Sequence, residues 1–150
     1  MRDSDLIKLY SGRILELAAD IPHTGRLPAP QGSARRRSAL CGSTVTVDVV
    51  MDGARVAGFA QDVKACALGQ AAASVMGRAL EGRTLPEIVA GRDALRAMLK
   101  DAGPVPAAPW GGFEVLLPAR EYRNRHASIL LAMEAAAEAV AQAEGAAAAM

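Results

Sequence analysis

The chain has 150 residues, the length of a single domain that can bury a hydrophobic core of its own. Apolar residues make up 51% of it but aromatic residues only 3%, so the core has to be built from aliphatic side chains and alanine. A formal net charge of +1, without aromatic residues interleaved on a basic surface, argues against nucleic acids and membranes as partners.

The first predicted element is an amphipathic helix that Pro22 helps to end. Its apolar side chains recur at three- and four-residue steps and run from Leu6 to Ile21. A loop rich in proline, glycine and arginine follows and extends through Arg35-Arg36-Arg37. We expect this basic run to be a solvated loop or a strand edge, and its alternative role is a docking patch for an acidic partner.

A β-hairpin comes next. Residues 44–49 alternate polar and apolar side chains, and Asp52-Gly53 is a strong signal for a two-residue turn. The returning strand is predicted over residues 55–61.

The hairpin register brings two cysteines together. With Asp52-Gly53 at the centre of the turn, Cys41 lies opposite Lys64, two residues before Cys66. An alanine-rich helix over residues 67–79 begins at Cys66, and the partial positive charge at that end of a helix favours a thiolate. Both thiols are therefore expected at the open end of one hairpin.

A third helix is predicted from a capping-box pattern. Thr84 and Glu87 have the spacing of such a box, and the apolar stripe that follows ends near Asp101. Residues 103–109 contain too many prolines for regular structure and should form a loop. Residues 113–117 are then expected to form a short extended segment.

The final helix places a histidine on its apolar stripe. Asn124 is the predicted N-cap, and His126 precedes Leu130 by four residues, so its ring should point from the first turn toward the core. The helix is expected to run to about Glu144. The tail, residues 145–150, is predicted to fray.

These elements make one α+β domain over residues 1–150, with a small, hairpin-based antiparallel sheet of about three strands packed against α-helices. No apolar run approaches the roughly 18 residues that cross a bilayer, and no signal-peptide pattern follows the first residues, so we expect a cytoplasmic protein. Cysteines in a reducing compartment seldom form a structural disulfide. We interpret Cys41, Cys66 and His126 as one metal or iron-sulfur site.

With these residues identified, the chain resembles the U-type iron-sulfur cluster assembly scaffolds, which are IscU, SufU and the N-terminal domain of NifU. The resemblance covers most of the chain. It rests on these segments: Tyr10-Ser11, the tract from Pro22 to Gly32, Cys41-Gly42, the small-residue helix after Cys66, Glu81-Gly82-Arg83-Thr84-Leu85, and His126-Ala127-Ser128-Ile129-Leu130.

The resemblance implies a fold, a cargo and partners. The cargo is iron or a [2Fe-2S] cluster held by Cys41, Cys66 and His126, the sulfur donor is a cysteine desulfurase, and apo iron-sulfur proteins are the acceptors. The chain departs from the family at two ligand positions, with Ser43 in place of an aspartate and Ala127 in place of a third cysteine. It also lacks the tract that IscU presents to its Hsp70 chaperone.

The number of ligands leaves one position open. A [2Fe-2S] cluster needs four terminal ligands, and two thiolates with one imidazole supply three. Ser43, Asp62, water or a thiolate from a partner chain could fill the fourth position, and the last of these would make a homodimer. The same three residues also match an exchangeable zinc site.

Three functions stay open on the sequence. The first is a scaffold that accepts, holds and transfers an iron-sulfur unit, which is a carrier and not an enzyme. The second is a zinc-binding, SufU-like sulfur acceptor for a cysteine desulfurase, and the third is a cofactor-free adaptor on the same fold. A Cys-His hydrolase is disfavoured because no segment reads as an oxyanion hole.

Overall fold

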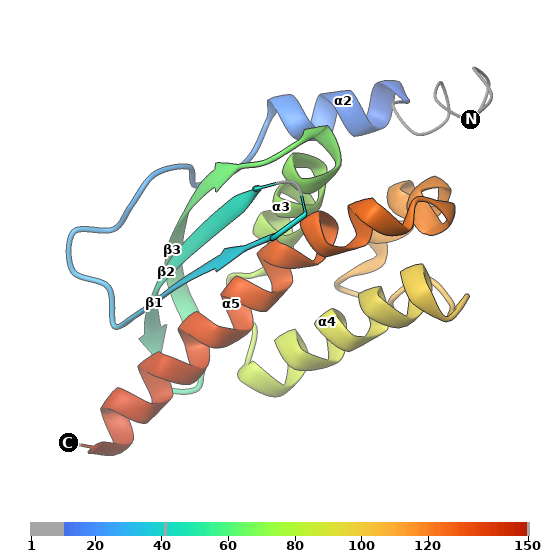
Figure 1. Cartoon of the computed structure of the whole chain (residues 1–150). Helices are drawn as coiled ribbons and strands as arrows, with labels where there is room; N and C mark the ends of the chain where they lie inside the picture. Colours follow the sequence, from blue (N-terminus) through green and yellow to red (C-terminus); the bar gives the residue numbers. More distant parts are fainter. Residues whose placement is uncertain (1–10, 41, 150) are drawn as a thin grey trace.

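The chain folds into a three-stranded antiparallel sheet with helices packed on one face (Figure 1). The structure is a computed structural model and describes residues 11–40 and 42–149. The predicted α+β class is confirmed. The elements in chain order are α2 (Gly12–Ala19), β1 (Gly32–Arg37), β2 (Thr44–Asp52), β3 (Arg55–Lys64), α3 (Ala67–Ala79), α4 (Leu85–Lys100), the 3₁₀ segment η1 (Gly111–Glu121) and α5 (Arg123–Ala149).

The predicted hairpin is formed by β2 and β3, but its turn is displaced. Asp52 pairs with Arg55, so Gly53 and Ala54 are the central residues, one position later than predicted. Gly53 has a φ of 59° and Ala54 does not have a positive φ. A II′-type turn requires this order, because its first central residue is the one in the glycine-favoured region.

The register at the open end of the hairpin differs as well. An irregularity between Val50 and Met51 adds a further shift, and Lys64 pairs with Thr44. The prediction that Cys41 lies opposite Lys64 is therefore wrong by three residues, because it allowed for neither the later turn nor the bulge. Cys41 itself lies outside the described residues.

The third strand, β1, occupies a segment that was predicted to be a loop. Gly32 and Ala34 are buried on the face that packs on α5, and this strand forms the edge of the sheet beside β2. The sequence hides this strand because its buried positions hold glycine and alanine, which are not typical of strands. Its pairing with β2 and its packing on α5 override the weak local signal.

The helices after the hairpin begin and end where the sequence predicted. α3 spans residues 67–79 and α4 ends at Lys100, next to the predicted Asp101. The Thr84 and Glu87 capping box is present at the start of α4. On α2, whose N-cap is Ser11, Ile14 and Leu17 lie on the predicted apolar stripe and are buried.

The segment predicted as extended, residues 113–117, is part of the 3₁₀ helix η1 instead. Phe113, Leu116 and Ala119 are its buried residues. Their three-residue spacing matches the three residues per turn of a 3₁₀ helix, so all of them face the core. Trp110, just before η1, is buried and its Nε1 donates a hydrogen bond to the carbonyl of Glu87.

The last helix, α5, is longer than predicted at both ends. It begins at Arg123, so Asn124 lies inside it, and it continues to Ala149 through the segment that was predicted to fray. It packs on β1, β2, α3 and α4 and is therefore the central helix of the fold. Among the described helices, none is long and apolar enough to cross a membrane.

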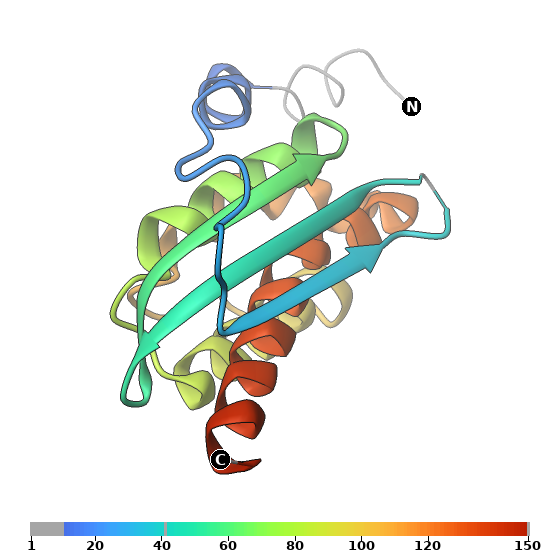
Figure 2. The same cartoon turned by 90° about the vertical axis from the view of Figure 1, so that its left-hand side faces the viewer.

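The other face of the sheet is crossed by the segment between α2 and β1 (Figure 2). Asp48 of β2 is fully buried there and accepts hydrogen bonds from Arg26 at 2.7 and 3.1 Å, from the Ser33 hydroxyl at 2.6 Å and from the Leu27 N–H at 3.1 Å. Through Arg26 and Leu27, this carboxylate binds the crossing segment to the outer face of the sheet.

Candidate functional site

Cys66 lies where the sheet meets the first helix packed on it. It follows β3 by two residues and is the N-cap of α3, with an extended backbone and no hydrogen bond from its side chain to the helix. The side chain is half-buried. Because the first N–H groups of a helix have no intrahelical acceptor, this thiol sits beside a locally positive end of the backbone.

Two serine hydroxyls connect Cys66 to the start of β2. The Cys66 Sγ lies 3.5 Å from the Ser128 Oγ, and the Ser128 Oγ lies 3.1 Å from the Ser43 Oγ. Ser128 is 1% exposed and Ser43 is 5% exposed. Ser128 of α5 therefore connects Ser43, at the start of β2, to Cys66, just after β3. The three side chains form one line.

Gly69 makes room for this bridge. A Cβ at this position would lie 2.7 Å from the Ser128 Oγ and 2.8 Å from the Ala65 Cβ. Any larger residue here would push Ser128 away from the start of α3, so the close approach of α3 and α5 depends on glycine.

The loop between β1 and β2 carries the first predicted ligand. Cys41 lies outside the described residues, but the residues around it form a closed turn, in which Ser38 N–H donates to the Ser43 carbonyl and Gly42 N–H donates to the Ser38 carbonyl. Ser43 is two residues after Cys41 and belongs to the line that ends at Cys66. The structure thus brings the predicted fourth ligand Ser43 and the predicted ligand Cys66 into one cluster.

His126 is buried, as predicted, but it faces elsewhere. Its Nε2 lies 3.0 Å from each of the carbonyl oxygens of Ala119 and Arg120, and the residue is 2% exposed. Carbonyl oxygens only accept hydrogen bonds, so Nε2 carries a hydrogen and Nδ1 is the nitrogen left for a ligand role. Two residues along a helix correspond to a rotation of about 200°, so His126 and Ser128 leave α5 on nearly opposite sides. The ligand role of His126 stays a prediction.

Asp62, the other predicted fourth ligand, lies on the outer face of the sheet. It pairs with Thr46, whereas the next pair, Val63 and Val45, belongs to the face that packs on the helices. The hydrogen bond and the charge of Asp48, and to a lesser extent the charge of Asp62, raise the pKa of Arg26. Asp62 thus interacts with the charge of Arg26 on the outer face of the sheet. Its ligand role stays a prediction.

The described part of the chain does not by itself contain a set of classical metal ligands. Within residues 11–40 and 42–149, no three His, Cys, Asp or Glu side chains gather closely enough to hold a metal ion. The cluster at Cys66 offers one soft sulfur donor and two hydroxyl oxygens. A second thiolate, which iron-sulfur and zinc sites both favour, has to come from Cys41 or from another chain.

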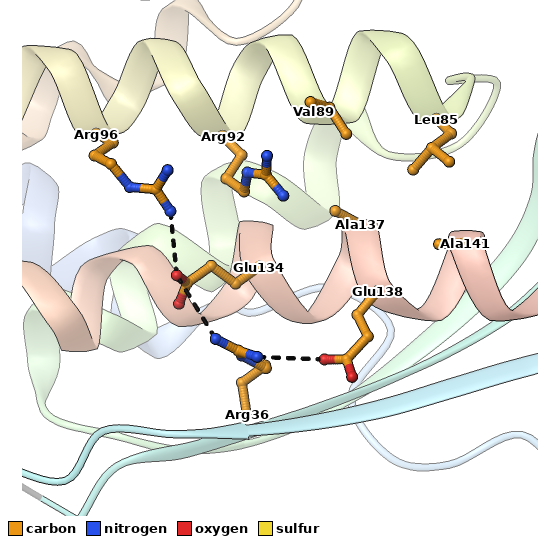
Figure 3. Close-up of a pocket in the computed structure, with 9 residues that line it drawn as sticks. All are labelled: Arg36, Leu85, Val89, Arg92, Arg96, Glu134, Ala137, Glu138 and Ala141. Atoms are coloured by element: carbon orange, nitrogen blue, oxygen red, sulfur yellow. Dashed lines mark hydrogen bonds and ion pairs between the residues drawn. The ribbon is translucent and has the colours of Figure 1, made fainter.

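A groove of about 340 Å³ lies between α4 and α5, beside β1 (Figure 3). Arg36 of β1 reaches it, and its guanidinium is 4.0 Å from Glu134 and 3.7 Å from Glu138, while Arg96 of α4 is 3.4 Å from Glu134. Strand alternation explains why only the middle residue of the arginine run points this way. The three arginines of the run are exposed and belong to the edge strand β1, so the predicted strand edge is confirmed. The alternative role as a docking patch stays a prediction.

Comparison with solved structures identifies similar proteins. The N-terminal part of a nitrogen-fixing NifU-like protein from Brucella abortus is 44% identical and has a TM-score of 0.91, with 94% of this chain and 98% of that chain covered. A candidate iron-sulfur cluster assembly scaffold protein for the SUF system of Fervidobacterium islandicum AW-1 shares the fold, with a TM-score of 0.79 at 19% identity over 89% of this chain and 98% of that chain. A hypothetical protein shares it too, with a TM-score of 0.80 at 21% identity over 90% and 98% of the two chains. No protein-family model and no curated protein matches the chain.

Proposed function

The chain belongs to the family of U-type iron-sulfur cluster assembly scaffolds, which includes the NifU-like N-terminal domains, and from this we propose that it binds iron or a labile iron-sulfur cluster as cargo and passes it to acceptor proteins. In this role it is a carrier and not an enzyme. Its working compartment is the cytoplasm, where a cysteine desulfurase supplies sulfur and apo iron-sulfur proteins take the product.

The observation that carries the proposal is the cluster at Cys66. A half-buried thiol stands at the positive end of α3, and the bridge through Ser128 brings to it the loop that holds Cys41. The first N–H groups of α3 have no intrahelical acceptor, so the backbone beside this sulfur is rich in hydrogen-bond donors. A cargo bound between two strand ends near the surface can be loaded and released without unfolding the core.

The donor set fits the cargo only when Cys41 takes part. Cys66 and Cys41 would supply the two thiolates, and Ser43 is one of the two hydroxyl oxygens in the described part of the cluster, the other being Ser128. His126 leaves α5 on the side opposite to Ser128, away from the cluster at Cys66. This favours Ser43 or a thiolate from a partner chain, and not the imidazole, as the ligand that completes the site. A site with few thiolates holds a cluster weakly, which suits transfer.

Sulfur would enter by thiolate exchange. The Cys66 thiolate attacks the outer sulfur of the desulfurase persulfide, the sulfur-sulfur bond breaks, and the desulfurase cysteine leaves as a thiolate. Cys66 keeps the transferred sulfur as a persulfide. No net electrons are gained or lost in this step, and iron with reducing equivalents is needed only afterwards.

The test is anaerobic reconstitution with ferrous iron, cysteine, a cysteine desulfurase and dithiothreitol as the reductant, followed by measurement of iron and acid-labile sulfide. We expect matching iron and sulfide on the wild type and neither on Cys41→Ala or Cys66→Ala, with circular dichroism unchanged. A folded wild type that takes up no iron and no sulfide would overturn the proposal.

The role of His126 needs a matched pair of variants. His126→Gln keeps an amide donor for the Ala119 and Arg120 carbonyls, whereas His126→Ala removes both the donor and the imidazole. If the imidazole is a ligand, both variants lose cargo. If its role is to satisfy the carbonyls, only His126→Ala is impaired, and it is impaired in thermal stability as well.

A zinc-binding sulfur acceptor is the second candidate, because the described cluster has a single exchangeable thiol with oxygen neighbours. Bound zinc without sulfide, together with stimulation of the desulfurase, would select it over the scaffold. No metal in any sample would leave an adaptor on the same fold.

A further inference from the structure

Ser128 belongs to the segment His126–Leu130 that carries the family resemblance, but the resemblance gives it no role. It stands in α5, the helix that packs on β1, β2, α3 and α4, so its backbone is fixed by the whole core. Its hydroxyl lies 3.5 Å from the Cys66 sulfur and 3.1 Å from the Ser43 hydroxyl. Gly69 leaves the space that this hydroxyl occupies.

The direction of the hydrogen bonds between Cys66, Ser128 and Ser43 depends on which of these groups carries a hydrogen. Each serine has one hydroxyl hydrogen and two acceptor lone pairs. With a thiol at Cys66, the sulfur can donate to Ser128, and Ser128 then donates to Ser43. A metal-bound sulfur can only accept, so Ser128 turns its hydrogen toward Cys66 and accepts from Ser43. Rotation of the Ser128 hydroxyl therefore lets it accept from a thiol or donate to a metal-bound sulfur.

We propose that Ser128 is a positioning residue for Cys66, whose hydroxyl fixes the direction of the sulfur in the free protein and donates to it when cargo is bound. The inference rests on the proposed function for its second half only. Hydrogen bonds from the outer shell to a metal ligand orient that ligand, and their loss typically weakens metal binding about 10- to 100-fold.

The first test needs no metal. In metal-free protein, the three-bond couplings between Hα and the two Hβ protons of Cys66 report whether its side chain has one rotamer or several. We expect one large and one small coupling, or two small ones, in the wild type, and averaged values in Ser128→Ala. Ser74→Ala is the matched control, because Ser74 is equally buried on α3 and bonds the Asp20 carbonyl instead.

The second test uses cobalt(II) as the probe under anaerobic conditions. The intensity of the thiolate-to-cobalt charge-transfer band gives the affinity, and we expect Ser128→Ala to bind about 10- to 100-fold more weakly than the wild type. Ser74→Ala should bind like the wild type.

The outcomes distinguish a failure of the positioning role of Ser128 from a failure of the proposed function. Unchanged Cys66 couplings in Ser128→Ala overturn the positioning role, and so does unchanged cobalt affinity. A wild type that binds no cobalt counts against the proposed function, and the couplings alone then decide the role of Ser128. If Ser128→Ala does not fold, Gly69→Ala replaces it, because the added Cβ displaces the hydroxyl while leaving it chemically intact. Wild-type couplings in Gly69→Ala would then overturn the inference.

Discussion

Asp48 is the buried charge whose ionisation should govern acid stability. Burial alone would raise its pKa, but hydrogen bonds from Arg26, from the Ser33 hydroxyl and from the Leu27 N–H together hold the pKa below the ordinary value of 3.8. A lowered folded-state pKa means that the carboxylate stabilises the fold fully above the unfolded-state value. This contribution is lost as the pH falls below 3.8 toward the folded-state pKa.

We therefore expect Asp48→Asn to cost about 1–3 kcal/mol of unfolding free energy at neutral pH and much less in strong acid. Urea unfolding of both proteins at a series of pH values measures the difference. Asp52→Asn, at the exposed end of the same strand, should show no such trend. A difference that stays constant down to the acid limit would mean that the amide in the Asp48→Asn variant is tolerated poorly for reasons of packing, not of charge.

Two of the three residues in the cluster at Cys66 could be predicted from the sequence, namely Ser43 and Cys66 itself. The order of hairpin and helix was enough to bring Ser43 and Cys66 to one end of the sheet, although the predicted register was wrong by three residues. Ser128 could not be found in this way, because its contact depends on how α5 crosses α3. The one local signal was a polar residue directly before the apolar run that starts at Ile129.

At the scale of elements, the start of α4 is held by a capping box formed by Thr84 and Glu87. The Glu87 carboxylate accepts from the Thr84 N–H at 3.1 Å and from the Thr84 hydroxyl at 3.0 Å, and the first of these bonds is the main reason that the pKa of Glu87 is lowered. Thr84→Ala should lower the free energy of unfolding by about 1 kcal/mol, while Thr84→Ser keeps the cap and should cost less than half of that. Chemical denaturation compares the three proteins, and equal losses in both variants would contradict a capping role.

Two glycines in helices should respond oppositely to alanine. At Gly145 of α5 an added Cβ meets nothing within 4 Å, so Gly145→Ala should stabilise the protein by about 0.5–1 kcal/mol. At Gly69 the added Cβ would lie 2.7 Å from the Ser128 Oγ, and crowding of this kind costs about 1–3 kcal/mol. Thermal unfolding of the pair measures both signs. An increase in melting temperature for Gly69→Ala would show that α3 and α5 can move apart easily.

The elements that the sequence predicted well are those with strong local signals. α3 and α4 have an apolar stripe and a recognisable start, so their ends were placed within a residue. β1 was missed because its stability comes from its neighbours, and η1 because its apolar residues were too few to separate a three-residue period from an extended segment. Tertiary packing decides both elements.

At the scale of the whole molecule, α5 determines how the site is supported. It contacts β1, β2, α3, α4 and η1, so Ser128 and His126 are held by the same rigid helix although they point to opposite sides. The face of the sheet away from the helices is closed by the segment that Asp48 fastens. Under the proposed function, a cargo would enter at the loop before β2 and the start of α3, where Ser43 and Cys66 lie.

The groove of Figure 3 joins three elements through Glu134, which lies between Arg36 of β1 and Arg96 of α4. The two arginine side chains are 47% and 41% exposed and the distances are 4.0 and 3.4 Å, so water and salt screen these pairs. We expect Glu134→Gln to cost less than about 1 kcal/mol at low salt.

That small cost should vanish in about 1 M sodium chloride, where the Debye length is about 3 Å. Urea unfolding at low and high salt measures it, with Glu144→Gln as a control, because none of the ion pairs described in the structure includes Glu144. A loss above about 2 kcal/mol that salt leaves unchanged would mean that Glu134 acts as a buried anchor for the edge strand. The screened result would instead mean that β1 is held to α5 by the packing of Gly32 and Ala34, and that the arginines of the groove are only loosely committed to their partners.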